Sequence, residues 1–182
     1  DGRAVLRGLR ELVALASAGN QADVSRLANA GAPDLLLTAL DRHVGKPEIA
    51  KIGLAALAVL VGGRPAVATW VVSIGAVETI RTSARSFESD AALSLQASRA
   101  LLAVASAHTF SAAPSTAAAP TEPSLGEPHR AHAAEVLLSV LERHPCDLAV
   151  ALSACKALCH VATGDDAARA AADIVLTEDG LS

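Results

Sequence analysis

The sequence predicts an all-α fold, a helical solenoid in which short units stack side by side. The first observation is an internal repeat. Gly31 and Gly75, each followed by alanine, lie 44 residues apart, and so do Leu57 and Leu101, each preceded by alanine. The second observation is that apolar residues recur at i, i+4, i+7 and i+8 in both copies, as on one stripe of an α-helix. A fixed period of this length built from helices is typical of a stacked array, because one unit alone cannot bury its apolar faces.

Composition supports helices and narrows the function classes. The chain has 182 residues, 52% of them hydrophobic but only 2% aromatic, and alanine is the most frequent. Alanine is the best helix former, so the mean hydropathy of +0.39 reflects alanine-rich helices rather than a lipid-facing surface. A net charge of -4, with few aromatic residues, argues against nucleic-acid binding. We therefore expect no nucleic-acid partner and no membrane insertion.

Each copy contains three predicted helices, with a glycine corner between the first and the second. Glycine suits that corner because it tolerates positive φ. Pro33 can start a second helix, where its missing N–H costs nothing. The predicted helices are 21–30, 34–42 and 48–61 in the first copy, and 66–74, 77–86 and 91–105 in the second.

The pattern also extends to both sides of the two copies. Residues 2–17 predict the third helix of a preceding unit, while 129–144 and 148–162 predict the second and third helices of a later one. Four of the eight prolines lie in 109–128, so we expect an exposed, disordered insertion there instead of a first helix. The chain starts at Asp1 and contains no methionine, so we expect a single repeat domain that is part of a longer protein. Its predicted segments are 1–19 (last helix of a preceding repeat), 20–63 and 64–108 (repeats), 109–128 (insertion), 129–163 (partial repeat) and 164–182 (start of a further repeat).

The repeat resembles the armadillo repeat. In that family a small-residue turn separates helices one and two, and helix three carries an Ala-Leu pair near its end. The matching residues are Gly31-Ala32 and Gly75-Ala76 for the turn, and Ala56-Leu57, Ala100-Leu101 and Ala157-Leu158 for the pair. The resemblance implies a right-handed alpha-alpha superhelix, an armadillo-like solenoid whose third helices line a concave groove. HEAT-type repeats, similar in length but usually made of two helices, are the alternative.

The resemblance also implies where a partner binds. The groove-lining asparagines of the family correspond here to Val59, Ala103 and His160, so the polar ladder that grips a peptide backbone is missing. One turn earlier stand Ala55, Arg99 and Lys156, and two turns earlier stand Ile52, Gln96 and Ser153. The implied groove is apolar at its N-terminal side and basic at its C-terminal side. Its implied partner-binding residues are Gln96, Arg99, Ser153, Lys156 and His160. The alternative is that Arg99 and Lys156 are merely solvated or paired with carboxylates.

Catalytic and metal-site motifs are weak in this sequence. Cys155, Cys159 and His160 form one local cluster, but a closed zinc site needs about four ligands and no second pair is present. We interpret the cysteines as ordinary buried small residues and expect neither metal nor cofactor. No nucleophile elbow, phosphate loop or metalloprotease motif occurs, so we expect no enzyme. Three irregularly spaced cysteines favour a reducing compartment, the cytoplasm, with the nucleus also open.

These observations predict a non-enzymatic protein-interaction scaffold. Its partner is a protein or an extended peptide, acidic in character if the basic strip binds it. Two alternatives stay open: a structural spacer, and a regulatory repeat segment attached to a kinase or a ubiquitin ligase.

We expect a nonspecific protease to cut first within 109–128, because proline-rich sequence lacks the hydrogen-bonded structure that protects helices. Time-resolved mass spectrometry of the fragments would locate the first cut. A first cut inside one of the predicted helices would contradict the assigned boundary.

Overall fold

The computed structural model describes residues 2–18, 21–110 and 127–162. Within these ranges every regular element is an α-helix and none is a strand, which confirms the all-α prediction. The superhelical course and its hand remain predictions. The helices are α1 (Gly2–Ala18), α2 (Gln21–Asn29), α3 (Ala32–Arg42), α4 (Pro47–Val61), α5 (Pro65–Ser73), α6 (Ala76–Ser86), α7 (Ala91–Phe110), α8 (Glu127–Arg143) and α9 (Leu148–Val161).

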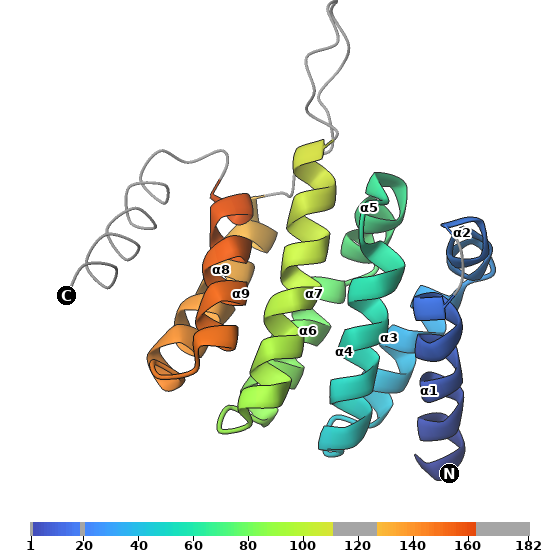
Figure 1. Cartoon of the computed structure of the whole chain (residues 1–182), viewed down its shortest axis with the longest axis horizontal. Coiled ribbons are helices and arrows are strands. Elements are labelled where there is room, and N and C mark those ends of the chain that lie inside the picture. The colour runs from blue at the N-terminus through green and yellow to red at the C-terminus, as the bar shows by residue number, and fades with distance from the viewer. Residues whose placement is uncertain (1, 19–20, 111–126, 163–182) are drawn as a thin grey trace, which may run out of the picture.

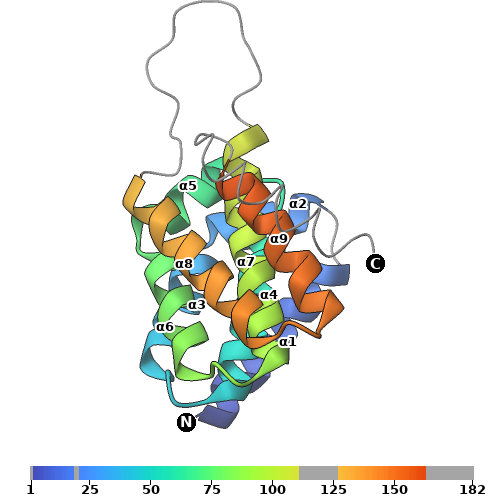
Figure 2. The same cartoon turned by 90° about the vertical axis from the view of Figure 1, so that its left-hand side faces the viewer.

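The helices form two layers. Helices α1, α4, α7 and α9 lie side by side in one layer, which we call the third-helix layer (Figure 1). Helices α3, α6 and α8 form the second layer, which lies to the left of the first in the turned view (Figure 2). Each helix of the second layer packs against a third helix that follows it in sequence, as α3 does against α4. This arrangement agrees with the units expected from the 44-residue period.

The corner that opens the second layer depends on glycine. Gly31 and Gly75 occupy the left-handed region, with φ of 85° and 91°. The N–H of Gly31 donates to Ala28 O at 3.2 Å, and Gly31 O accepts from Leu35 at 3.2 Å, so the residue joins two helices. A side chain at either glycine would be strained by this conformation. The predicted role of both glycines is confirmed.

A second turn, between the second and third helices of each unit, occurs three times with the same backbone hydrogen bond. The N–H groups of Lys46, Asp90 and Asp147 each donate to the carbonyl three residues earlier, at 2.9, 2.9 and 3.2 Å. The first two turns are 44 residues apart and the last two are 57 apart. The third unit therefore keeps the same turn although the chain between turns is 13 residues longer (57 − 44).

Each central third helix buries a broad face. Part of that face meets the second helix of the same unit, since a Cβ added at Gly53 would lie 2.6 Å from Leu40 Cδ2. Leu57 and Leu101, one turn after Gly53 and Ala97, have exposed fractions of only 0% and 2%. Burial of such leucines supplies most of the stability of a small helical domain.

The repeat alignment predicts that Leu57, Leu101 and Leu158 are equivalent positions that are all buried. Their positions are equivalent, but Leu158 is only half-buried. Helix α7 packs against α4, and α9 packs against α7. Among the described residues no third helix follows α9, so one side of α9 is less covered than the same side of α4 and α7. The prediction that all three leucines are core residues is therefore wrong for Leu158.

Two predicted boundaries also differ from the structure. Helix α7 continues to Phe110, beyond the predicted end at residue 105, because the alanine- and serine-rich sequence contains no stop signal there. Helix α8 begins at Glu127 and includes Pro128, which the first turn of a helix tolerates. The rest of the predicted insertion, 111–126, and the predicted further repeat, 164–182, lie outside the described residues.

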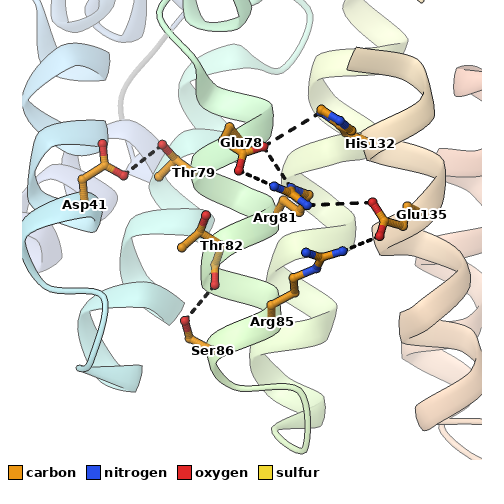
Figure 3. A network of polar contacts seen from close by, with 9 residues as sticks. All are labelled: Asp41, Glu78, Thr79, Arg81, Thr82, Arg85, Ser86, His132 and Glu135. Carbon is orange, nitrogen blue, oxygen red and sulfur yellow. Dashed lines mark hydrogen bonds and ion pairs between the residues drawn. The ribbon is translucent and has the colours of Figure 1, made fainter. Parts of the chain in front are cut away.

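A polar network joins the helices of the second layer (Figure 3). Glu78 accepts two hydrogen bonds from Arg81, at 2.6 and 2.9 Å, and these lower the pKa of its carboxyl. Glu135 of α8 pairs with Arg85 of α6 and lies 4.0 Å from Arg81. These contacts hold α8 against α6.

Two further contacts extend the network. The hydroxyl of Thr79 donates to Asp41 Oδ1 at 3.0 Å and so links α6 to α3. His132 of α8 lies 3.9 Å from Glu78.

In the part of the chain that is described, no helix has the length and apolarity needed to cross a bilayer.

Leu57→Ala and Leu101→Ala should each lower the free energy of unfolding by roughly 2–5 kcal/mol, because both side chains lie in the core. Leu158→Ala should cost about half as much, since the side chain is already half-exposed. Urea unfolding of the three variants measures this order. Equal losses at all three positions would show that Leu158 is as well covered as the others.

Candidate binding groove on the third-helix layer

A groove of about 440 Å³ crosses three members of the third-helix layer. It lies on the side of that layer that faces away from the second helices. Its floor and walls come from α1, α4 and α7, and most of them are small or apolar side chains. The lining residues are Arg10, Val13, Ala14, Lys51, Ile52, Ala55, Ala92 and Gln96.

An alignment of α1 with α4 shows which of their side chains occupy equivalent positions along the groove. Leu9 and Ala16 of α1 are buried as Leu54 and Val61 of α4 are, at a spacing of 45 residues. Arg10 then occupies the position of Ala55. The same position carries Arg99 on α7 and Lys156 on α9.

We call Arg10, Arg99 and Lys156 the basic strip. All three side chains are exposed, and within the described residues none makes an ion pair. Ala55 of α4 occupies the equivalent position between Arg10 of α1 and Arg99 of α7. Ala55 is apolar and lines the groove. The strip therefore presents three cations that have no ion-pair partner in the described part of the chain, beside an apolar floor.

The structure places the five predicted partner-binding residues in different surroundings. Gln96 lines the groove, while Arg99 and Lys156 belong to the basic strip. Ser153 is 9% exposed, and its hydroxyl makes no hydrogen bond to the described part of the chain. His160 is half-buried near the end of α9. Binding by any of these residues remains a prediction.

Of the two cations that line the groove, Lys51 has a carboxylate partner among the described residues and Arg10 has none. Its Nζ donates to Asp90 Oδ2 at 2.7 Å, and the two side chains are 29% and 28% exposed. The hydrogen bond raises the pKa of Lys51 and lowers the pKa of Asp90, and partial burial opposes both shifts. Asp90 also caps α7, because its Oδ1 accepts from the N–H of Leu93 at 3.1 Å.

A second hollow, of about 400 Å³, lies between α6 and α8. Its cations are already neutralised: Arg85 pairs with Glu135, and Arg143 pairs with Glu88 at 2.6 Å. A site whose charges are internally matched has little attraction left for a charged ligand. The groove on the third-helix layer is the better candidate.

Sequence reasoning missed Arg10, Lys51 and Asp90. The sequence does contain a signal for Arg10. The pattern of Gly8, Leu9 and Leu12 recurs as Gly53, Leu54 and Leu57, but at a spacing of 45 residues instead of 44. No periodic signal marks the pairing of Lys51 with Asp90, which depends on how α4 is set against α7.

The cysteine cluster on α9 has no metal-site character in the described residues, where no three candidate ligands come together. The prediction that these cysteines are buried is wrong, because Cys155 is only half-buried and Cys159 is exposed at the surface of α9. Burial raises the pKa of the Cys155 thiol, and the neighbouring Cys159 adds to the shift.

Comparisons with known proteins add no further assignment. No protein-family model matches the chain, and searches of curated proteins and of solved structures found no match either.

Acid should weaken the fold through Asp90. Its folded pKa lies below the ordinary value of 3.8, so its contribution to stability is present above that value and is lost as pH falls through the folded pKa. Asp90→Asn keeps a capping side chain but removes the charge. The difference in urea midpoint between the parent chain and Asp90→Asn should therefore be larger near ~pH 6 than near ~pH 2. An unchanged difference would mean that the ion pair adds no stability.

Proposed function

We propose that the chain is a non-enzymatic, intracellular interaction scaffold of the armadillo type. Its groove binds an extended acidic segment of a partner protein. Small apolar side chains of that segment contact the floor around Ile52 and Ala55. Its carboxylates or phosphates pair with the basic strip.

The observation that carries this proposal is the set of unpaired cations beside an apolar groove. The chain has more acidic than basic residues, 19 against 15, so an exposed cation has many possible partners. Arg81, Arg85 and Arg143 in the second layer all have such partners. Arg10, Arg99 and Lys156 have none within the described residues.

Physical chemistry favours an anionic ligand at this surface. Side chains at equivalent positions of stacked helices add their fields along one line, and a groove with low-dielectric walls concentrates that field. An extended peptide also fits the geometry, because it can follow a groove that crosses several helices. Its attraction should weaken as salt rises, since the strip is exposed to screening ions.

The double variant Arg99→Glu with Lys156→Glu tests the proposal. The probe is a fluorescein-labelled short peptide of alternating glutamate and alanine, measured by anisotropy at ~20 mM and ~200 mM salt. We expect the parent chain to bind the probe more tightly at the lower salt. The double variant should bind at least about tenfold more weakly, because two attractions become repulsions. Its melting temperature should change by less than about 3 °C, since both side chains are exposed.

The matched control is Arg42→Glu with Lys46→Glu, which makes the same change in net charge at two exposed positions outside the groove. It should retain most of the binding. Equal losses of affinity in both double variants would show that binding of the probe depends only on the net charge of the chain. If the parent chain does not bind the probe, the spacer alternative takes precedence over a binding groove.

A further inference from the structure

Lys51 holds an unusual place among the cations of this surface. It lines the groove, as Arg10 does, but its ammonium is held by Asp90 at 2.7 Å. An acidic ligand in the groove therefore meets one cation that is already neutralised and one carboxylate that repels it.

Asp90 can release Lys51 without losing its structural role. Its two carboxylate oxygens have separate partners: Oδ1 accepts from the N–H of Leu93, and Oδ2 accepts from Lys51. Breaking the contact to Lys51 leaves the cap of α7 in place and leaves Oδ2 accessible to water, since the side chain is 28% exposed. The ion pair is also partly exposed, a setting in which such pairs contribute little net stability.

We propose that Asp90 is a built-in competitor for the acidic ligand. On binding, a carboxylate or phosphate of the partner replaces Asp90 Oδ2 at Lys51, and Lys51 joins the basic strip as a fourth cation. Asp90 thereby lowers the affinity of the groove and selects partners with enough negative charge to displace it. This inference rests on the proposed function of the groove.

The chain contains its own control for this role. Asp147 caps α9 as Asp90 caps α7, with Oδ1 accepting from Ala149 and Val150 at 3.0 and 3.1 Å. The position equivalent to Lys51 on α7 is Leu95, so Asp147 has no matching lysine. Asp90→Asn and Asp147→Asn therefore make the same change in net charge and retain the same kind of cap, and only the first releases a lysine in the groove.

The first test compares these two variants with the glutamate–alanine peptide at low salt. Asp90→Asn should bind the probe about three- to tenfold more tightly than the parent chain, because it frees an attraction and removes a repulsion. Asp147→Asn should stay within about twofold of the parent. Equal gains in the two variants would overturn the inference and attribute the effect to net charge.

The second test asks whether Lys51 carries the gain. Lys51→Gln should lower affinity less in the parent chain than in the Asp90→Asn chain, because in the parent chain the ligand must first displace Asp90 to gain the ammonium. In the Asp90→Asn chain the same change should cancel the added affinity, which is a double-mutant cycle on one pair. An equal loss in both backgrounds would overturn the inference, because Lys51 would then be available to the ligand despite Asp90.

A third readout needs no ligand. Acetylation of Lys51, followed by mass spectrometry and normalised to the exposed Lys46, should be faster in Asp90→Asn than in the parent chain. An unchanged ratio would mean that Asp90 does not restrain the ammonium.

The failures of the two ideas are distinguishable. If Arg99→Glu with Lys156→Glu abolishes binding while Asp90→Asn behaves as Asp147→Asn does, the groove stands and the competitor role falls. If no variant binds the probe, both fall.

Discussion

The close approach of the second and third helices within a unit is the constraint on which the rest of the structure depends. Gly53 brings α4 so near α3 that even a methyl group there would collide with Leu40. The corresponding residues of α7 and α9, Ala97 and Ala154, are also small and are fully buried. Each of α4 and α7 packs both against the second helix of its own unit and against the next third helix. The outer side of the layer is then left for the groove.

The two layers treat charge differently. In the second layer, arginines face glutamates on the neighbouring helix, and these pairs fix how α8 sits on α6. On the outer side of the third-helix layer, the equivalent positions repeat the same sign of charge, so neighbouring side chains cannot neutralise one another. Matched charges help to fix α8 on α6, whereas the like charges of the basic strip leave a field on the outer side of the third-helix layer. Lys51 and Asp90 form an ion pair on the outer side of the third-helix layer, where the cations of the basic strip have no partner among the described residues.

Much of the helical layout could be predicted from the sequence because its signals are local. The corners at positions 31 and 75 need a positive φ, which glycine permits. Asp147 can cap the helix that follows it, and apolar spacing marks the buried faces. The ends of α7 and α8 were harder to place, since alanine, serine and a proline in the first turn permit helix without demanding it. The burial of Leu158 and the pairing of Lys51 with Asp90 depend on neighbouring helices, and no local pattern encodes them. Arg10 escaped notice because the first unit is offset by a single residue.

The repeated turn before each third helix has a consequence for engineering. Its backbone hydrogen bond is the same before Asp90 and before Asp147, although the intervening chain is longer in the second case. Unit geometry is thus set within each helix pair and not by the length of chain that joins one pair to the next. The connection between α7 and α8 is accordingly a natural insertion point for a fluorescent reporter or an affinity tag. Such a fusion would label the chain while leaving the spacing of its helices intact.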